Sequence, residues 1–264
     1  MTLTYLLIIF VLGTIVGSFL NVVVYRYNTG LSFVTGRSKC FSCGKHLHWY
    51  ELLPLFSFLM LGGKCLKCNS KISYQYFAVE FVTGAIFSGL FLKFGLTSLL
   101  PLYFLIASIL IIIAVYDFKH KIIPDGMSLI FIILSIFVFI FTHNLSEVFN
   151  LPALLDLLAA LILFAFFAFF WLVSGGKWMG FGDAKLAIGV GFLLGFSGGI
   201  FAIMMAFWIG AIFSLIIMLL QKIKIFKSKL SLKSEVPFAP FIIIAVFIQL
   251  FTSWNINNII NFLS

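Results

Sequence analysis

Residues 3–25 read LTYLLIIFVLGTIVGSFLNVVVY, an apolar run without a charge that is long enough to cross a lipid bilayer. No basic segment precedes this run, while Arg26 and Arg37 follow it. That charge polarity is opposite to that of a cleaved signal peptide. We therefore expect a permanent membrane helix whose N-terminus lies outside the cytoplasm.

The composition extends this expectation to the whole chain. Of its 264 residues, 63% are hydrophobic and 9% are charged, whereas average soluble domains carry about 25% charged residues. The mean hydropathy of +1.21 excludes a soluble globular protein, and the low charge excludes a disordered one. The net charge of +9 suits loop bias in a membrane protein, so we expect no nucleic-acid partner.

Seven more apolar runs follow the first one. They cover residues 76–94, 98–116, 125–142, 152–174, 184–196, 199–220 and 236–254. The run 184–196 rises only about 20 Å, less than the hydrocarbon thickness. Its three glycines suggest a helix that is tilted, broken or half-buried between its neighbours. The predicted fold is an all-α polytopic membrane protein with about eight transmembrane helices, or seven if this run does not span.

Basic residues predict the orientation of these helices. Sixteen of the 17 Lys and Arg residues lie in or beside loops 26–75, 117–124, 175–183 and 221–235, and only Lys93 lies on the other side. The positive-inside rule places these loops in the cytoplasm and both termini outside. We expect the lysines of residues 222–233 to contact anionic membrane lipids.

The first loop contains two C-x2-C pairs. The four cysteines are Cys40, Cys43, Cys65 and Cys68. Two such pairs at this separation predict a tetrahedral, structural zinc site, because cytosolic thiols stay reduced and four thiolates leave no open position. Redox-active or metal-free thiols are the alternative. His46 and His48 follow the first pair, but loop histidines are more often solvated than ligands.

Carboxylates in or beside membrane helices are candidates for function because they are costly there. Asp117 ends the third run, at the helix end that disfavours an anion, and Asp183 opens the sixth. A simple N-cap is the alternative for Asp183, and a helix-start position explains Asp125. The pair of Asp117 and Asp183 is suited to acid–base chemistry or, alternatively, to a proton or ion relay.

Several ordered motifs together resemble one family. They are GSFLNVVVYR (17–26), the two C-x2-C pairs, ISYQYFAVE (72–80), Asp117-x7-Asp125 after Ile-Pro, and GxGDxK (180–185). This set is similar to bacterial type IV prepilin peptidases, bifunctional leader peptidases and N-methyltransferases among the GxGD membrane aspartic proteases. The resemblance extends from about Gly17 to Pro240.

The resemblance implies a catalytic dyad of Asp117 and Asp183, prepilin or pseudopilin substrates, and S-adenosylmethionine as the methyl donor. Gly180 and Gly182 are candidates for substrate binding, because a missing Cβ lets an extended peptide approach the backbone. Glu80 is a third candidate for substrate binding, as part of the methylation site. An interfacial carboxylate and a structural partner for a loop lysine are its other interpretations. The resemblance also implies location in the bacterial plasma membrane.

The same resemblance suggests a division of labour. Residues 1–95 would form the zinc-containing region associated with methyl transfer, and residues 96–264 a six-helix peptidase core. Two departures concern Ala239, where glycine is usual, and Gly62-Gly63-Lys64, which lacks the common arginine. The first departure would alter packing near the site. The second would weaken the methyltransferase activity. A GxGD peptidase without methyl transfer and a proton-coupled transporter are the rival functions, and the choice between pilus, type II secretion and competence stays open.

Overall fold

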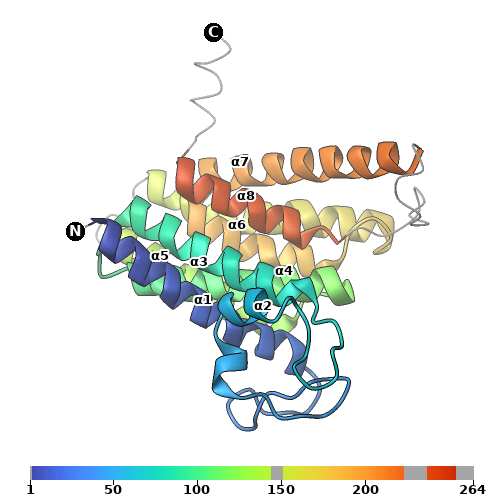
Figure 1. Ribbon diagram of the computed structural model, residues 1–264. Helices are drawn as coiled ribbons and strands as arrows, with labels where there is room; N and C mark the ends of the chain where they lie inside the picture. The colour runs from blue at the N-terminus through green and yellow to red at the C-terminus, as the bar shows by residue number, and fades with distance from the viewer. Residues whose placement is uncertain (1, 144–150, 223–236, 254–264) are drawn as a thin grey trace. The chain divides into compact units, whose positions relative to one another are not determined.

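The computed structural model describes residues 2–143, 151–222 and 237–253 (Figure 1). Within these ranges the chain is helical, with isolated bridges but no strand, which confirms the all-α prediction. The helices are α1 (Thr2–Arg26), η1 (Trp49–Leu52), α2 (Phe56–Met60), α3 (Tyr74–Phe94), α4 (Leu100–His120), α5 (Asp125–Thr142), α6 (Leu151–Ser174), α7 (Phe181–Lys222) and α8 (Ala239–Thr252).

Six of the described helices are long and apolar enough to cross a membrane, and α8 is a shorter apolar helix. The eight expected runs all fall on described helices, because α7 contains both the sixth and the seventh. The chain is therefore a multi-pass membrane protein. Most of the expected lysine-rich loop, residues 223–236, lies outside the described residues.

A break in α7 accounts for the short sixth run. Gly195 adopts φ 68° and ψ −170°, which separates a first half, 181–194, from a second half, 196–222. Asp156 of α6 accepts a hydrogen bond from the Phe196 N–H at 2.8 Å, at the start of that second half. His143 Nε2 lies 3.4 Å from the other carboxylate oxygen of Asp156. The expectation of a broken helix is confirmed, and a carboxylate of α6 holds the break.

The chain forms two compact units, residues 1–112 and 113–264, whose boundary falls within α4. In unit 1, α1 packs closely against α3. A Cβ on Gly13 would lie 2.7 Å from the Cα of Gly84, and a Cβ on Gly17 would lie 2.8 Å from the Cα of Glu80. These pairs, four residues apart on each helix, define an antiparallel packing that requires glycine in α1.

Unit 2 is built around α7, which packs against α5, α6 and α8. Its core contains fully buried side chains such as Phe131, Phe167, Leu186 and Ile242. Gly191 of α7 faces the backbone of Ala160 in α6 so closely that a Cβ there would collide with it. This tight packing fixes the first half of α7, which begins at the GxGD motif.

Candidate active site and metal site

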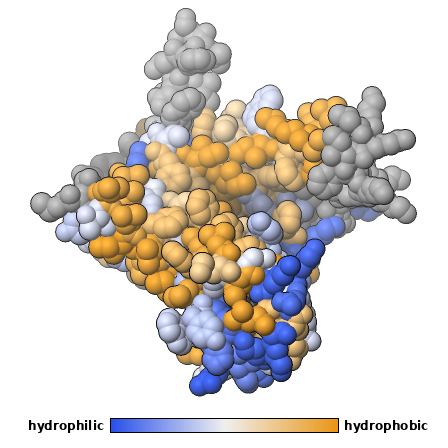
Figure 2. All heavy atoms as spheres, viewed as in Figure 1, coloured by the Kyte–Doolittle hydropathy of each residue, from blue (hydrophilic) through white to orange (hydrophobic). Residues whose placement is uncertain are grey.

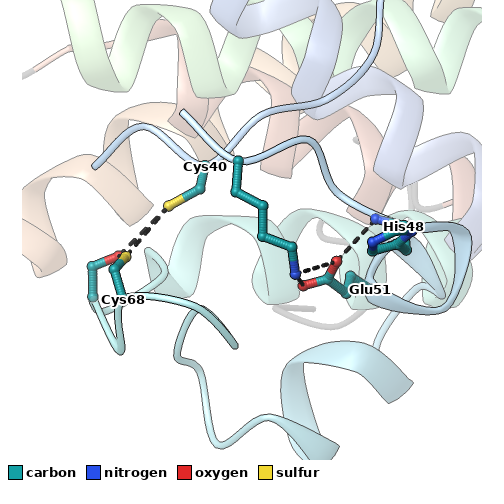
Figure 3. A network of polar contacts seen from close by, with 6 residues as sticks. Cys40, His48, Glu51 and Cys68 are labelled. Atoms are coloured by element: carbon teal, nitrogen blue, oxygen red, sulfur yellow. Dashed lines mark hydrogen bonds and ion pairs between the residues drawn. The ribbon is translucent and has the colours of Figure 1, made fainter. Parts of the chain in front are cut away.

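The four cysteines of unit 1 converge on one point. Their Sγ atoms all lie within 4.8 Å of one another. A tetrahedral zinc site with Zn–S bonds of about 2.3 Å has S···S separations of about 3.8 Å. The Cys40 and Cys68 Sγ atoms, drawn in Figure 3, are 3.9 Å apart, which fits that geometry and is far too long for a disulfide. The residues can therefore hold one metal ion.

Both cysteine pairs lie on the same kind of turn. The turns are closed by Cys40 N–H to Lys45 O, Gly44 N–H to Cys40 O, Cys65 N–H to Ser70 O and Asn69 N–H to Cys65 O, each at 2.9–3.0 Å. The residue after the second cysteine has positive φ in both turns, 68° at Gly44 and 54° at Asn69. Glycine and asparagine tolerate that conformation best, so the sequence favours both turns locally.

Electrostatics within the cluster favour a bound cation. The backbone hydrogen bond from Cys43 contributes most to lowering the pKa of Cys40 to about 6, and a hydrogen bond with Ser70 lowers the pKa of Cys68. At Cys43 the backbone hydrogen bond with Lys45 lowers the pKa, but burial and the neighbouring thiols outweigh it and raise the pKa to about 11. The raised pKa of Cys43 reflects the cost of a further thiolate beside the other sulfur atoms, and a bound metal ion would offset that cost.

A buried carboxylate supports the first turn (Figure 3). Glu51 accepts bonds from Lys45 Nζ at 3.0 and 3.1 Å and from the His48 N–H at 2.9 Å. The His48 N–H contributes most to lowering the pKa of Glu51. The His48 ring stacks on Tyr50, and neither His48 nor His46 belongs to the sulfur cluster in the described part of the chain.

The two candidate catalytic aspartates meet in unit 2. Asp117 lies in the last turn of α4, and Asp183 lies in the first turn of α7. Both residues are buried, with exposed fractions of 4% and 6%, and their carboxylates lie close enough to interact electrostatically. The structure thus brings together two carboxylates that are far apart in the sequence.

The surroundings of Asp117 include a contact that the sequence did not reveal. The backbone amide of Ala239, the first residue of α8, interacts with the Asp117 carboxylate. Asp117 Oδ2 is buried and has no hydrogen-bond partner among the described residues. A buried carboxylate oxygen without a partner needs a proton, a water molecule or a substrate group. The proline next to Ala239, Pro240, is the only local sign of a helix start there.

The two glycines before Asp183 differ in their environments. A Cβ on Gly182 would lie 2.8 Å from the Cβ of Ile123, in the α4–α5 connection. Gly182 therefore lets the start of α7 approach the segment that follows Asp117. A Cβ on Gly180 would meet no atom closer than Asp183 Oδ2, at 3.7 Å. The substrate-binding role of both glycines stays a prediction.

Asp125 is set apart from the buried pair. It begins α5, its side chain is 76% exposed, and its Oδ1 accepts a 2.7 Å bond from Lys185 Nζ. Lys185 also lies 5.3 Å from the Phe181 ring centroid. This ion pair connects the starts of α5 and α7, a contact that the GxGDxK spacing alone does not indicate.

Glu80 belongs to unit 1, where it is buried in α3. Its Oε2 accepts a 2.8 Å hydrogen bond from the Leu55 N–H of the connecting loop. The structure thus gives Glu80 a backbone partner, and its role in substrate binding stays a prediction.

Asp156, which accepts the hydrogen bond at the α7 break, is a further carboxylate within a membrane-spanning helix that the sequence analysis missed. Its position inside an apolar run was the available signal.

Two family models match the chain. The family model "Bacterial Peptidase A24 N-terminal domain" matches residues 11–94, and "Type IV leader peptidase family" matches residues 104–215. No solved structure is significantly similar to the chain.

Three curated relatives carry the name prepilin leader peptidase/N-methyltransferase. The Bacillus subtilis protein is 32% identical over 233 residues, which cover 88% of each chain. The Pseudomonas aeruginosa protein is 28% identical over 94% of this chain and 90% of its own length. The Myxococcus xanthus protein is 42% identical over 120 residues, which are 46% of this chain and 36% of that protein. With matched family models in both units and a relative similar over most of its length, the chain belongs to the type IV leader peptidase family of prepilin leader peptidase/N-methyltransferases.

Proposed function

We propose that this protein is a membrane aspartic endopeptidase that removes the leader from type IV prepilins or pseudopilins and then N-methylates the new N-terminus. The observation that carries the peptidase assignment is the buried pair of Asp117 and Asp183, with one Asp117 oxygen lacking a partner among the described residues. Family membership supports both activities.

Paired carboxylates in an apolar site share a proton, because two adjacent negative charges are costly there. The ionised member takes a proton from a water molecule, whose oxygen attacks the scissile carbonyl, while the protonated member donates to the carbonyl oxygen. Collapse of the tetrahedral intermediate breaks the C–N bond and returns a proton to the leaving amine. The products are a leader with a free carboxylate and a shortened protein with a free amine.

The substrate chemistry suits a site at the cytoplasmic membrane face. A prepilin presents a short basic leader followed by an apolar helix. We place this chain in the bacterial inner membrane with both termini outside, so that the Asp117 end of α4 and the Asp183 end of α7 face the cytoplasm. The distribution of Lys and Arg supports this orientation.

When bound, S-adenosylmethionine would supply an electrophilic methyl group: the new amine would form the N–C bond as the sulfonium S–C bond breaks, and the thioether product and a proton would leave. In unit 1 an open surface cavity of about 460 Å³ is lined by Arg37, His48, Trp49 and neighbouring residues, and Trp49 is 75% exposed. A guanidinium suits the carboxylate of this methyl donor, and an indole suits its adenine and sulfonium groups. We assign the donor to this cavity; Trp49→Ala should weaken its binding in calorimetry without changing the metal content.

We assign the cysteine cluster to structural zinc, because four thiolates complete a tetrahedral shell without an open position. The zinc would fold the two turns of the loop beside the donor cavity and take no part in bond breaking.

Co-expression of this protein with a prepilin in a host without its own leader peptidase tests the assignment. Intact-mass spectrometry should find the substrate shortened by its leader and carrying one added methyl group. Cleavage without the methyl group would favour the peptidase-only alternative. An uncut prepilin, together with proton-coupled transport by the purified protein, would favour the transporter.

A further inference from the structure

One segment of the polar loop between α1 and α3 is almost entirely apolar. Residues 52–61 read LLPLFSFLML, and eight of these ten residues are Leu, Phe or Met. The nearest charges are Glu51 on one side and Lys64 on the other. We call these ten residues the apolar segment; it contains α2.

The apolar segment is exposed rather than folded into a core. The exposed fractions are 71% for Phe56, 65% for Leu59 and 81% for Met60. Figure 2 shows hydrophobic atoms directly beside the hydrophilic surface of this loop. Contiguous exposed apolar surface of this kind marks a binding surface for another apolar phase.

Contacts with α3 set the depth of the apolar segment. The Leu55 N–H donates to Glu80 Oε2, and Glu80 lies six residues after the start of α3, about 9 Å along its axis. The Phe58 ring packs 5.2 Å from the Tyr74 ring and 5.5 Å from the Phe77 ring. The apolar segment therefore lies alongside the first two turns of a membrane-spanning helix, not beyond its end.

The backbone of the apolar segment is adapted to a surrounding without water. The N–H groups of Ser57, Leu59 and Leu61 donate to carbonyls within the segment. Leu55, at a φ of 61°, gives its N–H to the buried Glu80 carboxylate instead. Lipid requires such internal partners, because no water is available to replace them.

The charges around the apolar segment indicate which phase covers it. The exposed basic residues of the loop are Arg37, Lys39, Lys64, Lys67 and Lys71. The one acid in residues 26–75 is Glu51, which pairs with Lys45. These basic side chains attract anionic lipid headgroups and repel a basic peptide.

We propose that residues 52–61 are an interfacial membrane segment, whose Phe56, Leu59 and Met60 side chains insert into the bilayer at the level of the first two turns of α3. The flanking lysines lie among the headgroups. An interfacial segment buries its apolar face about 5–10 Å into this boundary, which agrees with the depth of Glu80. One cysteine turn precedes the apolar segment and the other follows it. The function of the segment is to hold both turns at the membrane surface. This inference does not depend on the proposed catalytic activity.

Site-specific photo-cross-linking of the full-length protein in nanodiscs tests the inference. A benzophenone amino acid replaces Phe56 or Met60, and Val34, which is 87% exposed in the same loop, is the matched control. The nanodiscs contain phosphatidylcholine and phosphatidylglycerol. We expect lipid adducts from the probe at positions 56 and 60, and none from the probe at position 34. Equal lipid labelling at all three positions would overturn the inference. So would labelling of a co-reconstituted prepilin or of a second copy of the chain in place of lipid.

A smaller probe checks that the benzophenone does not itself drive insertion. Trifluoromethyl-phenylalanine at position 56 should relax faster with a spin-labelled lipid than with an aqueous gadolinium chelate, and the order should reverse at position 34. Stronger relaxation by the aqueous chelate at position 56 would place the apolar segment in water and contradict the inference.

Discussion

The four cysteines of unit 1 lie on two short turns of the same type, whereas the two aspartates of unit 2 lie at the ends of separate helices. Each cysteine turn is closed by its own backbone hydrogen bonds, so each pair of sulfur ligands is positioned locally. The aspartate pair exists only when α4, α7 and α8 are packed. The comparison teaches that one chain can contain a metal site set by local sequence and a carboxylate site set by tertiary packing.

The largest effect is expected from variants that disrupt the aspartate pair of unit 2. Asp117→Asn and Asp183→Asn should each lower the rate of leader cleavage by at least about 10³-fold, because each removes one member of the acid–base pair. The double variant should be no worse than either single variant, since the pair acts as a unit. Rates come from a purified cleavage assay in nanodiscs.

Asp125→Asn is the matched control for these variants, because Asp125 is exposed and paired with Lys185. It should retain most of the activity. Robust cleavage by Asp117→Asn, or loss of activity only in Asp125→Asn, would refute the assignment of the pair.

The second-largest effect is expected from variants that disrupt the four-cysteine metal site of unit 1. Cys43→Ser should abolish zinc binding, from about one ion per chain to almost none, because a structural site needs all four thiolates. Elemental analysis measures the metal, and limited proteolysis should then cut within residues 36–71 before any membrane helix. His46→Ala is the control and should keep its zinc, since His46 is not in the cluster. Equal zinc in wild type and Cys43→Ser would contradict the metal site.

A pair of glycine variants sharpens the account of packing near the aspartates. Gly182→Ala forces a Cβ to within 2.8 Å of Ile123 and should displace Asp183, with about a 100-fold loss in cleavage rate. Gly180→Ala meets only ordinary contacts, so kcat should change little, while KM should rise if the substrate backbone approaches there. Removing the Cβ that it meets, with Ile123→Gly in the Gly182→Ala background, should restore part of the rate. Wild-type kinetics for Gly182→Ala would show that this close approach is not needed.

The smallest effect concerns the break in α7. Asp156→Ala removes the acceptor of the Phe196 N–H and should cost about 1–2 kcal/mol of stability, as loss of a helix cap does. Asp156→Asn keeps an acceptor oxygen and should lose less. Thermal unfolding in detergent ranks the three proteins. Identical melting temperatures for wild type and Asp156→Ala would mean that Gly195 alone maintains the break.

Features that depend on neighbouring residues were predictable from the sequence. The apolar runs predicted the membrane helices, and the C-x2-C spacing predicted the sulfur cluster. The glycines of residues 184–196 indicated a tilted, broken or half-buried helix, and the structure shows a break. Each pattern acts over a few residues, through periodicity, turn conformation or ligand spacing.

Contacts between distant residues were not predictable in this way. Nothing local to Asp117 indicates that the amide of Ala239 interacts with it, because α8 reaches that position only through packing on α7. The bond between Glu80 and Leu55 has the same origin, in the docking of a loop on α3. The resemblance of ordered motifs predicted a pair of Asp117 and Asp183, whereas these supporting contacts required the structure.

The central claim is that cleavage depends on the aspartate pair and methyl transfer on the region with the four cysteines. The most direct test gives a synthetic, already cleaved pilin N-terminus and S-adenosylmethionine to the Asp183→Asn and Cys43→Ser proteins in nanodiscs, and mass spectrometry counts the methyl groups. We expect Asp183→Asn, which cannot cut a prepilin, to methylate this peptide at the wild-type rate, and Cys43→Ser to fail. Loss of methylation in Asp183→Asn, or its persistence in Cys43→Ser, would contradict the account.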